Sequence, residues 1–400
     1  MREREGIVNP FAPASPAVVF FACTACRSLL RLHHLHAIMT PASPAPLQGE
    51  GERIQVNAID KVLQTHQRVV EEGYVQEGGL KYRCYAVSTL RGGVGKSTLA
   101  FNVAYELTAT RSLLLADLCA QCNLTETLMR GIEQDITIVR ALQPVLLGPA
   151  FGQAPEDVSY RVSSYCDPFK ARKPAYFIRG DAEMFAFPSV LYQQLQIASA
   201  QGNPRAVRAL LESLKTILDQ ECQLKKVDGI LLDTSPFYAG GTHLAWCAAD
   251  AMIIPVRVDE HSIESLELTL SLLSDPARDF SVWNTRAGGR TAPKVAAIVM
   301  TMVGSKSRIR ATPDRASRMY IERAIDIAER YAALFDYPDP SDAFVITDDF
   351  VSAGRVSLAK SIPISQLKIG SFHTVGDKRL QVNKSAERYQ RELAYLISVL

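Results

Sequence analysis

The stretch from Tyr82 to Thr110, YRCYAVSTLRGGVGKSTLAFNVAYELTAT, holds the residues best suited to chemistry. An apolar lead-in runs into a glycine-rich turn and then into a helical pattern, so the order is strand, loop and helix. The glycines let successive N–H groups turn inward and cradle phosphate oxygens at the positive end of the helix. In such a loop the lysine reaches the β and γ phosphates, and the hydroxyl after it holds Mg²⁺. The predicted phosphate-binding residues are Gly92, Gly93, Val94, Gly95, Lys96, Ser97 and Thr98.

The start of this loop departs from the ordinary pattern. An ordinary phosphate loop has a glycine five residues before Gly95, and here Leu90 occupies that position, while Arg91 precedes the glycine pair. The run resembles the deviant loop of the ParA/MinD family of ATPases, written KGGVGKS/T, with Arg91 in place of the signature lysine. The resemblance implies a nucleotide-sandwich dimer in which Arg91 reaches the phosphates held by the partner. Arginine keeps the charge and presents a planar fork instead of a compact ammonium.

A second motif follows the loop helix. Residues 112–116, SLLLA, predict a buried strand that delivers Asp117 at its carboxyl end, the edge where open α/β sheets place ligands. The run ADLCAQCNLT resembles the family motif DLDPQGN, with Asp117, Gln121 and Asn123 matching. The resemblance gives Asp117 a role at Mg²⁺ and in catalysis. Cys119 stands where the family carries the aspartate that orients the attacking water, so we expect slow hydrolysis.

The third motif is VDGILLDTSP. The apolar strand Gly229 to Leu232 ends in Asp233, the Walker B arrangement, in which a carboxylate at a strand end holds the Mg²⁺ shell. The segment from Asp233 resembles the DxPP run of the family. Together with Ser97 and Asp117, Asp233 completes the predicted metal site.

Two later strands are predicted over Lys294 to Met302 and Phe344 to Thr347. In relatives, the segments that follow these strands enclose the adenine ring. The resemblance therefore makes Met302, Val303, Thr347 and Asp348 the candidate base contacts.

The run from Val303 to Arg323 carries six basic and two acidic residues, a local charge of +4. Both a solvated helix face and a DNA-backbone surface fit this composition. In ParA relatives a basic patch in the carboxyl-terminal third binds DNA without sequence preference. The candidate DNA contacts are Lys306, Arg308, Arg310, Arg315 and Arg318.

Cysteine pairs leave a further alternative open. Cys119 and Cys122 form a CxxC, which is compatible with a redox or iron–sulfur role and also with two structural cysteines. Near the amino terminus, a second CxxC is followed by HxxH, both zinc ligand types. These residues are Cys23, Cys26, His33 and His36.

Composition bounds the remaining possibilities. A chain of 400 residues with 47% hydrophobic content can bury a sizeable core, and a net charge of +2 excludes a globally basic nucleic-acid binder. The longest apolar run, Ala17 to Cys26, is shorter than the roughly 20 residues of a membrane span, so we expect no segment to cross a membrane and no membrane partner. Because a nucleotide loop needs cytoplasmic ATP, we expect a cytoplasmic protein. We expect a disordered tail over 1–50, an amphipathic helical extension over 51–80, and a nucleotide domain over 81–400.

These parts predict an α/β fold, with a doubly wound, mostly parallel sheet and helices on both faces. The resemblance implies an ATP-dependent homodimeric switch ATPase that uses ATP and Mg²⁺. It also implies that the protein binds DNA without sequence preference, binds a ParB-like partner and acts in plasmid or chromosome partition. Such a protein would be associated with the nucleoid. One alternative is a hydrolysis-poor ATP-binding regulator that recruits a protein partner. Another is a redox P-loop protein that uses its CxxC cysteines.

Overall fold

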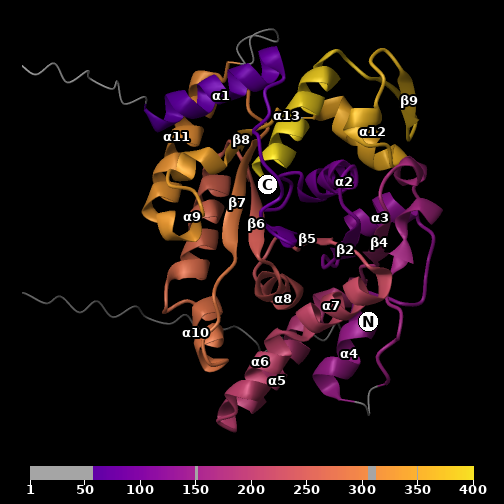
Figure 1. Cartoon of the computed structure of the whole chain (residues 1–400), viewed down its shortest axis with the longest axis vertical. Helices are drawn as coiled ribbons and strands as arrows, with labels where there is room; N and C mark the ends of the chain where they lie inside the picture. Colours follow the sequence, from indigo (N-terminus) through magenta and orange to yellow (C-terminus); the bar gives the residue numbers. More distant parts are fainter. Residues whose placement is uncertain (1–56, 149–151, 305–311, 349) are drawn as a thin grey trace, which may run out of the picture. The chain divides into compact units, whose positions relative to one another are not determined.

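A mostly parallel β-sheet forms the centre of the computed structural model (Figure 1), which describes residues 57–148, 152–304, 312–348 and 350–400. Within these residues the sheet has eight strands in the order β3-β4-β2-β5-β1-β6-β7-β8. Only β3 runs antiparallel to its neighbour. The strands are β1 Cys84–Val87, β2 Leu113–Asp117, β3 Tyr160–Arg161, β4 Ala175–Ile178, β5 Gly229–Asp233, β6 Ala251–Arg257, β7 Lys294–Thr301 and β8 Phe344–Ile346. The predicted doubly wound sheet is confirmed.

Helices cover both faces of the sheet (Figure 1). One face carries α2, α3, α12 and α13, and the other carries α4 to α11. The helices are α1 Ala58–Glu72, α2 Lys96–Leu107, α3 Asn123–Met129, α4 Ile138–Leu147, α5 Phe187–Ala200, α6 Pro204–Leu211, α7 Ser213–Lys225, α8 Gly240–Ala248, α9 Glu260–Ser274, α10 Asp279–Arg286, α11 Arg315–Arg330, α12 Val351–Lys360 and α13 Ser385–Val399. No helix among the described residues is long and apolar enough to cross a membrane.

The central strands read as continuous apolar runs because both of their faces are buried. All residues of β1, β2 and β5 are buried. Alternate side chains serve the two cores: Ala86 belongs to the core beneath α4 to α11, whereas Tyr85 and Val87 belong to the core beneath α2, α3, α12 and α13. The period of two along a strand thus distributes one sequence run between two hydrophobic layers.

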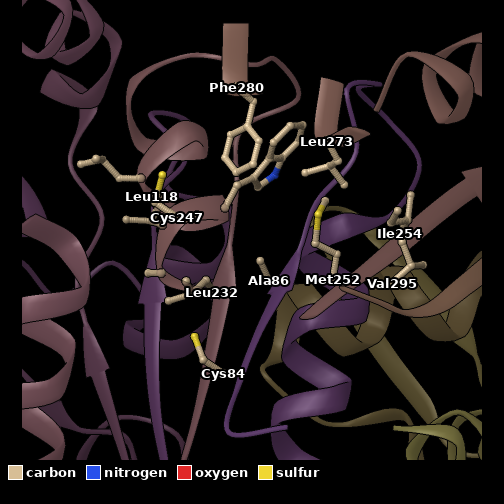
Figure 2. Close-up of a cluster of buried hydrophobic side chains, with 14 of the residues drawn as sticks. Cys84, Ala86, Leu118, Leu232, Cys247, Met252, Ile254, Leu273, Phe280 and Val295 are labelled. Atoms are coloured by element: carbon tan, nitrogen blue, oxygen red, sulfur yellow. The ribbon is translucent and has the colours of Figure 1, made fainter. Parts of the chain in front are cut away.

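Figure 2 shows part of the core between the sheet and α8 to α10. The sulfur atoms of Cys84 and Cys247 lie there among apolar side chains that include Met252 and Phe280. Burial raises the pKa of the Cys247 thiol to about 12. These two cysteines therefore act as small apolar core residues.

The helix α1 packs on the nucleotide domain within the compact unit Gln55–Leu400. Its residues Ile59 and Val62 join the core beneath α4 to α11. The Lys61 ammonium bridges Asp339 and Asp342 at 2.7 and 2.6 Å. The helix thus follows the amphipathic pattern of the sequence, and it begins at Ala58, within the segment expected as an extension.

The balanced charge of residues 385–400 predicts a docked closing helix rather than a basic membrane anchor, and α13 is docked. Tyr389, Leu393 and Leu396 enter the core with α2. The Arg391 guanidinium also donates to the carbonyl oxygens of Val70 and Glu71 at the end of α1. The two helices therefore hold each other on the sheet.

Three elements differ from the sequence prediction. The proline at 204 and the apolar spacing after it predict one long helix from Pro204 to Gln223, and this prediction was wrong. The segment forms α6 and α7, with Glu212 between them at φ −92° and ψ 2°. The Arg208 guanidinium of α6 donates to the carbonyl oxygens of residues 287–289, a tertiary contact that periodicity does not encode. The helix α5 and the hairpin of β9, Phe372–Val375, with β10, Lys378–Gln381, were not predicted.

Docking of α1 can be tested by truncating a buried side chain in its first turn. Ile59 is 1% exposed, so Ile59→Ala should lower the free energy of unfolding by about 2–5 kcal/mol, the usual cost of such a core truncation. Gln64→Ala, on the exposed side of the same helix, is the matched control and should change it by less than about 0.5 kcal/mol. Urea unfolding measures both values. Equal midpoints for the two variants would show that α1 does not contribute to the core.

Candidate nucleotide site

The glycine-rich loop lies at the carboxyl end of β1 and leads directly into α2. Gly93 and Gly95 have φ of 75° and 86°, which an L-side chain rarely adopts, and Gly95 caps the amino end of α2. Val94 is buried, and its carbonyl oxygen accepts from the Thr301 hydroxyl at 3.4 Å, which ties the loop to β7. The loop N–H groups therefore stand at a helix amino terminus, the place that favours phosphate.

Lys96 occupies the first residue of α2 and is 8% exposed. Its ammonium folds back and donates to the Arg91 carbonyl oxygen at 2.9 Å. Burial lowers the pKa of Lys96, and the nearby Asp233 and Cys119 oppose that shift. A buried cation beside the loop can exchange this single carbonyl contact for phosphate oxygens.

Asp233 ends β5 and is 1% exposed, yet neither of its carboxylate oxygens has a hydrogen-bond partner in the described structure. Burial raises the pKa of this carboxyl to about 7, the neighbouring Asp117 adds to the rise, and Ser97 and Lys96 oppose it. An unpartnered buried carboxylate is costly unless a cation meets it. Because carboxylate and hydroxyl oxygens are the ligands that Mg²⁺ takes, Asp233 with Ser97 fits a Mg²⁺ site.

Asp117 lies next to Asp233 across the pairing of β2 with β5. It is fully buried, and burial raises its pKa. Its carboxylate accepts from the Cys119 N–H at 3.0 Å and from the Thr125 N–H and hydroxyl at 2.9 and 2.8 Å. Asp117 was expected at the metal, whereas here its oxygens hold the turn that leads into α3. In this arrangement its direct role is to position that turn, including Cys119.

Cys119 and Cys122 lie in the same turn, where the Cys122 N–H donates to the Cys119 carbonyl oxygen. Cys119 is 5% exposed, and burial raises its pKa. Burial likewise raises the pKa of Cys122 to about 12. Both side chains therefore stay neutral thiols near pH 7, whereas redox chemistry proceeds through the thiolate. Within the described residues no cluster of three or more cysteine, histidine or carboxylate side chains is arranged to hold a metal ion, so the CxxC is not part of such a cluster. The CxxC and HxxH pairs of residues 23–36 lie outside those residues.

A cavity of about 270 Å³ opens between the phosphate loop and α12. Val94 and Thr98 of the loop line it together with Met302 and Asp348, two of the four candidate base contacts, whereas the candidate Val303 is buried and does not line it. Thr347 is fully buried instead and donates to the Met300 carbonyl oxygen, so it does not line this cavity. The residues that sequence reasoning missed come from the far wall, and they are Phe350, Gly354, Arg355 and Leu358. Only one feature of the sequence indicated that these residues line the cavity, namely their place directly after the last predicted strand.

The candidate DNA contacts are not gathered into one described surface. Lys306, Arg308 and Arg310 lie outside the described residues. Arg315 is exposed at the start of α11, and the Arg318 guanidinium pairs with Asp60 of α1 at 2.7 Å. An ion-paired guanidinium is a weaker candidate for a phosphate contact than an unpaired one.

The unpartnered carboxylate of Asp233 gives a pH-dependent prediction. Its folded pKa of about 7 exceeds the ordinary value of about 3.9, so the folded state binds more protons over that range and its stability falls as the pH rises from about 4 to 7. Asp233→Asn removes this loss. Without Mg²⁺ the variant should be more stable than the wild type by about 1–3 kcal/mol at pH 8, and by less at pH 5.

Urea unfolding at the two pH values measures this difference, with exposed Asp135→Asn as the matched control. Added Mg²⁺ should stabilise the wild type at pH 8 and leave Asp233→Asn unchanged. The same stability difference at both pH values would show that Asp233 does not titrate in this range.

Comparisons with known proteins agree with this geometry. A family model described as an AAA domain matches residues 82–275. The structure of Cyanothece McdA in complex with ATP is 18% identical, with a TM-score of 0.51 over 72% of this chain and 90% of that chain. A plasmid partition protein from Borrelia burgdorferi bound to AMPPNP is 16% identical, with a TM-score of 0.44 over 78% of this chain and 97% of that chain. No curated sequence matches the chain. The family match, the sheet order and the GGVGKS loop together show that residues 82–275 have a P-loop nucleotide-binding α/β fold.

Proposed function

We propose that the chain is an ATP-dependent dimerising switch ATPase of the ParA kind, which acts in plasmid or chromosome partition, binds DNA without sequence preference and meets a ParB-like partner. Two ATP-bound subunits would face each other across their phosphate loops, and hydrolysis would separate them. Support comes from the nucleotide site described above and from the likeness of the fold to a McdA protein solved with ATP.

The observation that carries this proposal is the state of Arg91. Its side chain is exposed beside Gly92 and Gly93, and among the described residues it forms no ion pair. Its backbone carbonyl oxygen holds Lys96, so the residue is fixed at the mouth of the loop while its guanidinium faces outward. A fixed, unpaired guanidinium suits a bidentate contact with phosphate on a second subunit.

Each residue of the loop then has a defined task. The N–H groups of the glycine-rich turn bind the phosphates, and Lys96 exchanges its contact with the Arg91 carbonyl for the terminal phosphate oxygens. Ser97 and Asp233 would hold Mg²⁺, which would supply positive charge to neutralise the charge developing on those oxygens. Asp117 holds the turn that carries Cys119. The cavity along α12 has room for the base.

A second candidate function is a hydrolysis-poor regulator that recruits a protein partner while ATP is bound. Cys119 favours it, because a buried neutral thiol is a weak hydrogen-bond partner for an attacking water. The redox alternative has less support, since burial raises the pKa of both CxxC thiols. The switch ATPase and the hydrolysis-poor regulator differ in the rate of ATP hydrolysis, and both functions use the ATP-bound dimer.

Dimerisation is tested by sedimentation velocity with Mg²⁺-ATP, with ADP and without nucleotide. The wild type should form a dimer only with ATP. Arg91→Ala should weaken that dimer by about 10- to 100-fold, because a charge-assisted hydrogen bond contributes about 1.5–3 kcal/mol. Arg140→Ala, another exposed arginine, is the matched control and should behave as wild type. Lys96→Ala should lose ATP binding and stay monomeric. A wild-type monomer under all three conditions would overturn the dimeric switch.

Turnover is tested by single-turnover ATP hydrolysis. A group that orients the water and shares its proton typically contributes about 10² to 10⁴ in rate, so Cys119→Asp should hydrolyse ATP at least about tenfold faster without binding it more tightly. Cys122→Asn, in the same turn and at a left-handed position that asparagine tolerates, is the control. A wild-type rate equal to that of Cys119→Asp would show that another group activates the water.

A further inference from the structure

A cluster of charged and polar side chains lies behind the nucleotide cavity, and three of its four members have no task in the site described above. The cluster consists of Asp348 after β8, Arg388 and Glu392 on α13, and His66 on α1. The helix α13 contacts both α1 and β8, and Figure 1 shows these three elements together above the sheet centre. Residues from opposite ends of the described chain thus meet at one wall of the cavity.

The carboxyl group of Glu392 is completely inaccessible to solvent. Its Oε2 accepts from the Asp348 backbone N–H at 3.1 Å. Its Oε1 lies 3.6 Å from Arg388 Nε and 3.9 Å from His66 Nε2, and it has no hydrogen-bond partner among the described residues. Burial raises the pKa of this carboxyl to about 8, although Arg388 opposes the rise, so the group is largely protonated near pH 7. A buried polar group of this kind is costly, which makes it a candidate for a functional role.

Arg388 holds the side chain of Asp348, just as Glu392 holds its backbone. The Arg388 guanidinium forms an ion pair with the Asp348 carboxylate, and both side chains are mostly buried. The next residue of α13, Tyr389, packs edge-on against the ring of Phe350, with the ring centroids 5.4 Å apart. Asp348 and Phe350 both line the cavity of about 270 Å³. The helix α13 therefore supports this wall through three separate contacts.

The Asp348 carboxylate gives the wall a preference among purine bases. In its ion pair with Arg388 the carboxylate accepts hydrogen bonds and donates none. Adenine carries an exocyclic amino group, which is a donor, whereas hypoxanthine carries a carbonyl oxygen at the same ring position. A site built to accept from an amino group discriminates against an analogue that lacks it, because the acceptor is then left unpaired. This discrimination requires that the carboxylate be held in place, which is what Arg388 and Glu392 do.

We propose that Arg388 and Glu392 of α13 are positioning residues, which hold Asp348 as the acceptor for the exocyclic amino group of a purine base bound in the cavity. Asp348 contacts the base, and the two residues of α13 act through it. His66 of α1 closes the cluster behind Glu392 as a neutral imidazole, because burial lowers its pKa to about 4. The inference rests on the nucleotide site of the proposed function and adds how the base is selected.

The test uses the full chain with Mg²⁺ and measures dissociation constants by isothermal titration calorimetry. ADP is compared with inosine diphosphate, which has a carbonyl oxygen in place of the amino group, and tripolyphosphate serves as a ligand without a base. The wild type should bind ADP at least about tenfold more tightly than inosine diphosphate, which is the usual effect of a hydrogen bond to a charged group.

The variants separate the residue that contacts the base from those that position it. Asp348→Asn offers an amide that can donate to the carbonyl oxygen of hypoxanthine, so the preference for ADP should fall. Glu392→Leu and Arg388→Met should lower the preference as well, without changing the affinity for tripolyphosphate. Glu392→Gln should retain the preference, because its amide oxygen accepts from the same Asp348 N–H and the side chain is neutral, as the protonated carboxyl is.

Glu387→Leu is the matched control, since this exposed carboxylate of the same helix pairs with Arg391 at 3.2 Å and should bind all three ligands as wild type. Urea unfolding establishes that each variant is folded in the assay. Equal binding of ADP and inosine diphosphate by the wild type would overturn the inference and leave the nucleotide site standing. An undiminished preference in both Glu392→Leu and Arg388→Met would show that α13 does not position Asp348. If the wild type binds neither ADP nor tripolyphosphate, the nucleotide site of the proposed function itself fails.

Discussion

Three charged groups have to be buried together at one edge of the sheet, and the rest of the structure depends on how this is done. Lys96, Asp117 and Asp233 are all nearly inaccessible to solvent. Removing charge from water is costly unless each group is compensated. Asp117 is compensated by three hydrogen bonds from the turn that follows it, and Lys96 by a loop carbonyl. Asp233 has no such partner among the described residues, so its carboxylate is the group left uncompensated at this edge.

Hydrogen bonds also join the elements that surround this edge. The loop is tied to β7 through Thr301, and the turn after β2 is tied to Asp117 and, through the Thr125 hydroxyl, to the N–H of Gly180 at the end of β4. A Cβ at Gly180 would come within 3.0 Å of the Asp117 side chain. The position of the Asp117 carboxylate is therefore set by the close packing of the ends of β2 and β4, and not by a distant charge.

Charge is distributed differently on the outer surface. Three arginines of α11, Arg318, Arg323 and Arg330, are paired with acidic residues of α1 and α9, which fastens these helices together. Such exposed pairs contribute little to stability, about 0–1 kcal/mol each, but they occupy the cations. The cations of α12 and the hairpin have no such partners among the described residues. Paired and unpaired basic residues look alike in a sequence, although only the second kind is available to an external anion.

The sequence alone determined the phosphate loop, the strands that carry the three motifs and the class of the sheet. These follow from local patterns: glycines before Lys96, apolar runs that end in Asp117 and Asp233, and helices between them. It also indicated α1 and α13 through their amphipathic spacing. Tertiary structure decided which atoms those residues contact. Asp117 accepts hydrogen bonds from Thr125 because α3 folds back over β2. Residues of α12, and not Thr347, line the base cavity. The break between α6 and α7 and the pairing of α11 arginines arise from residues far apart in the chain, whose proximity no local pattern encodes.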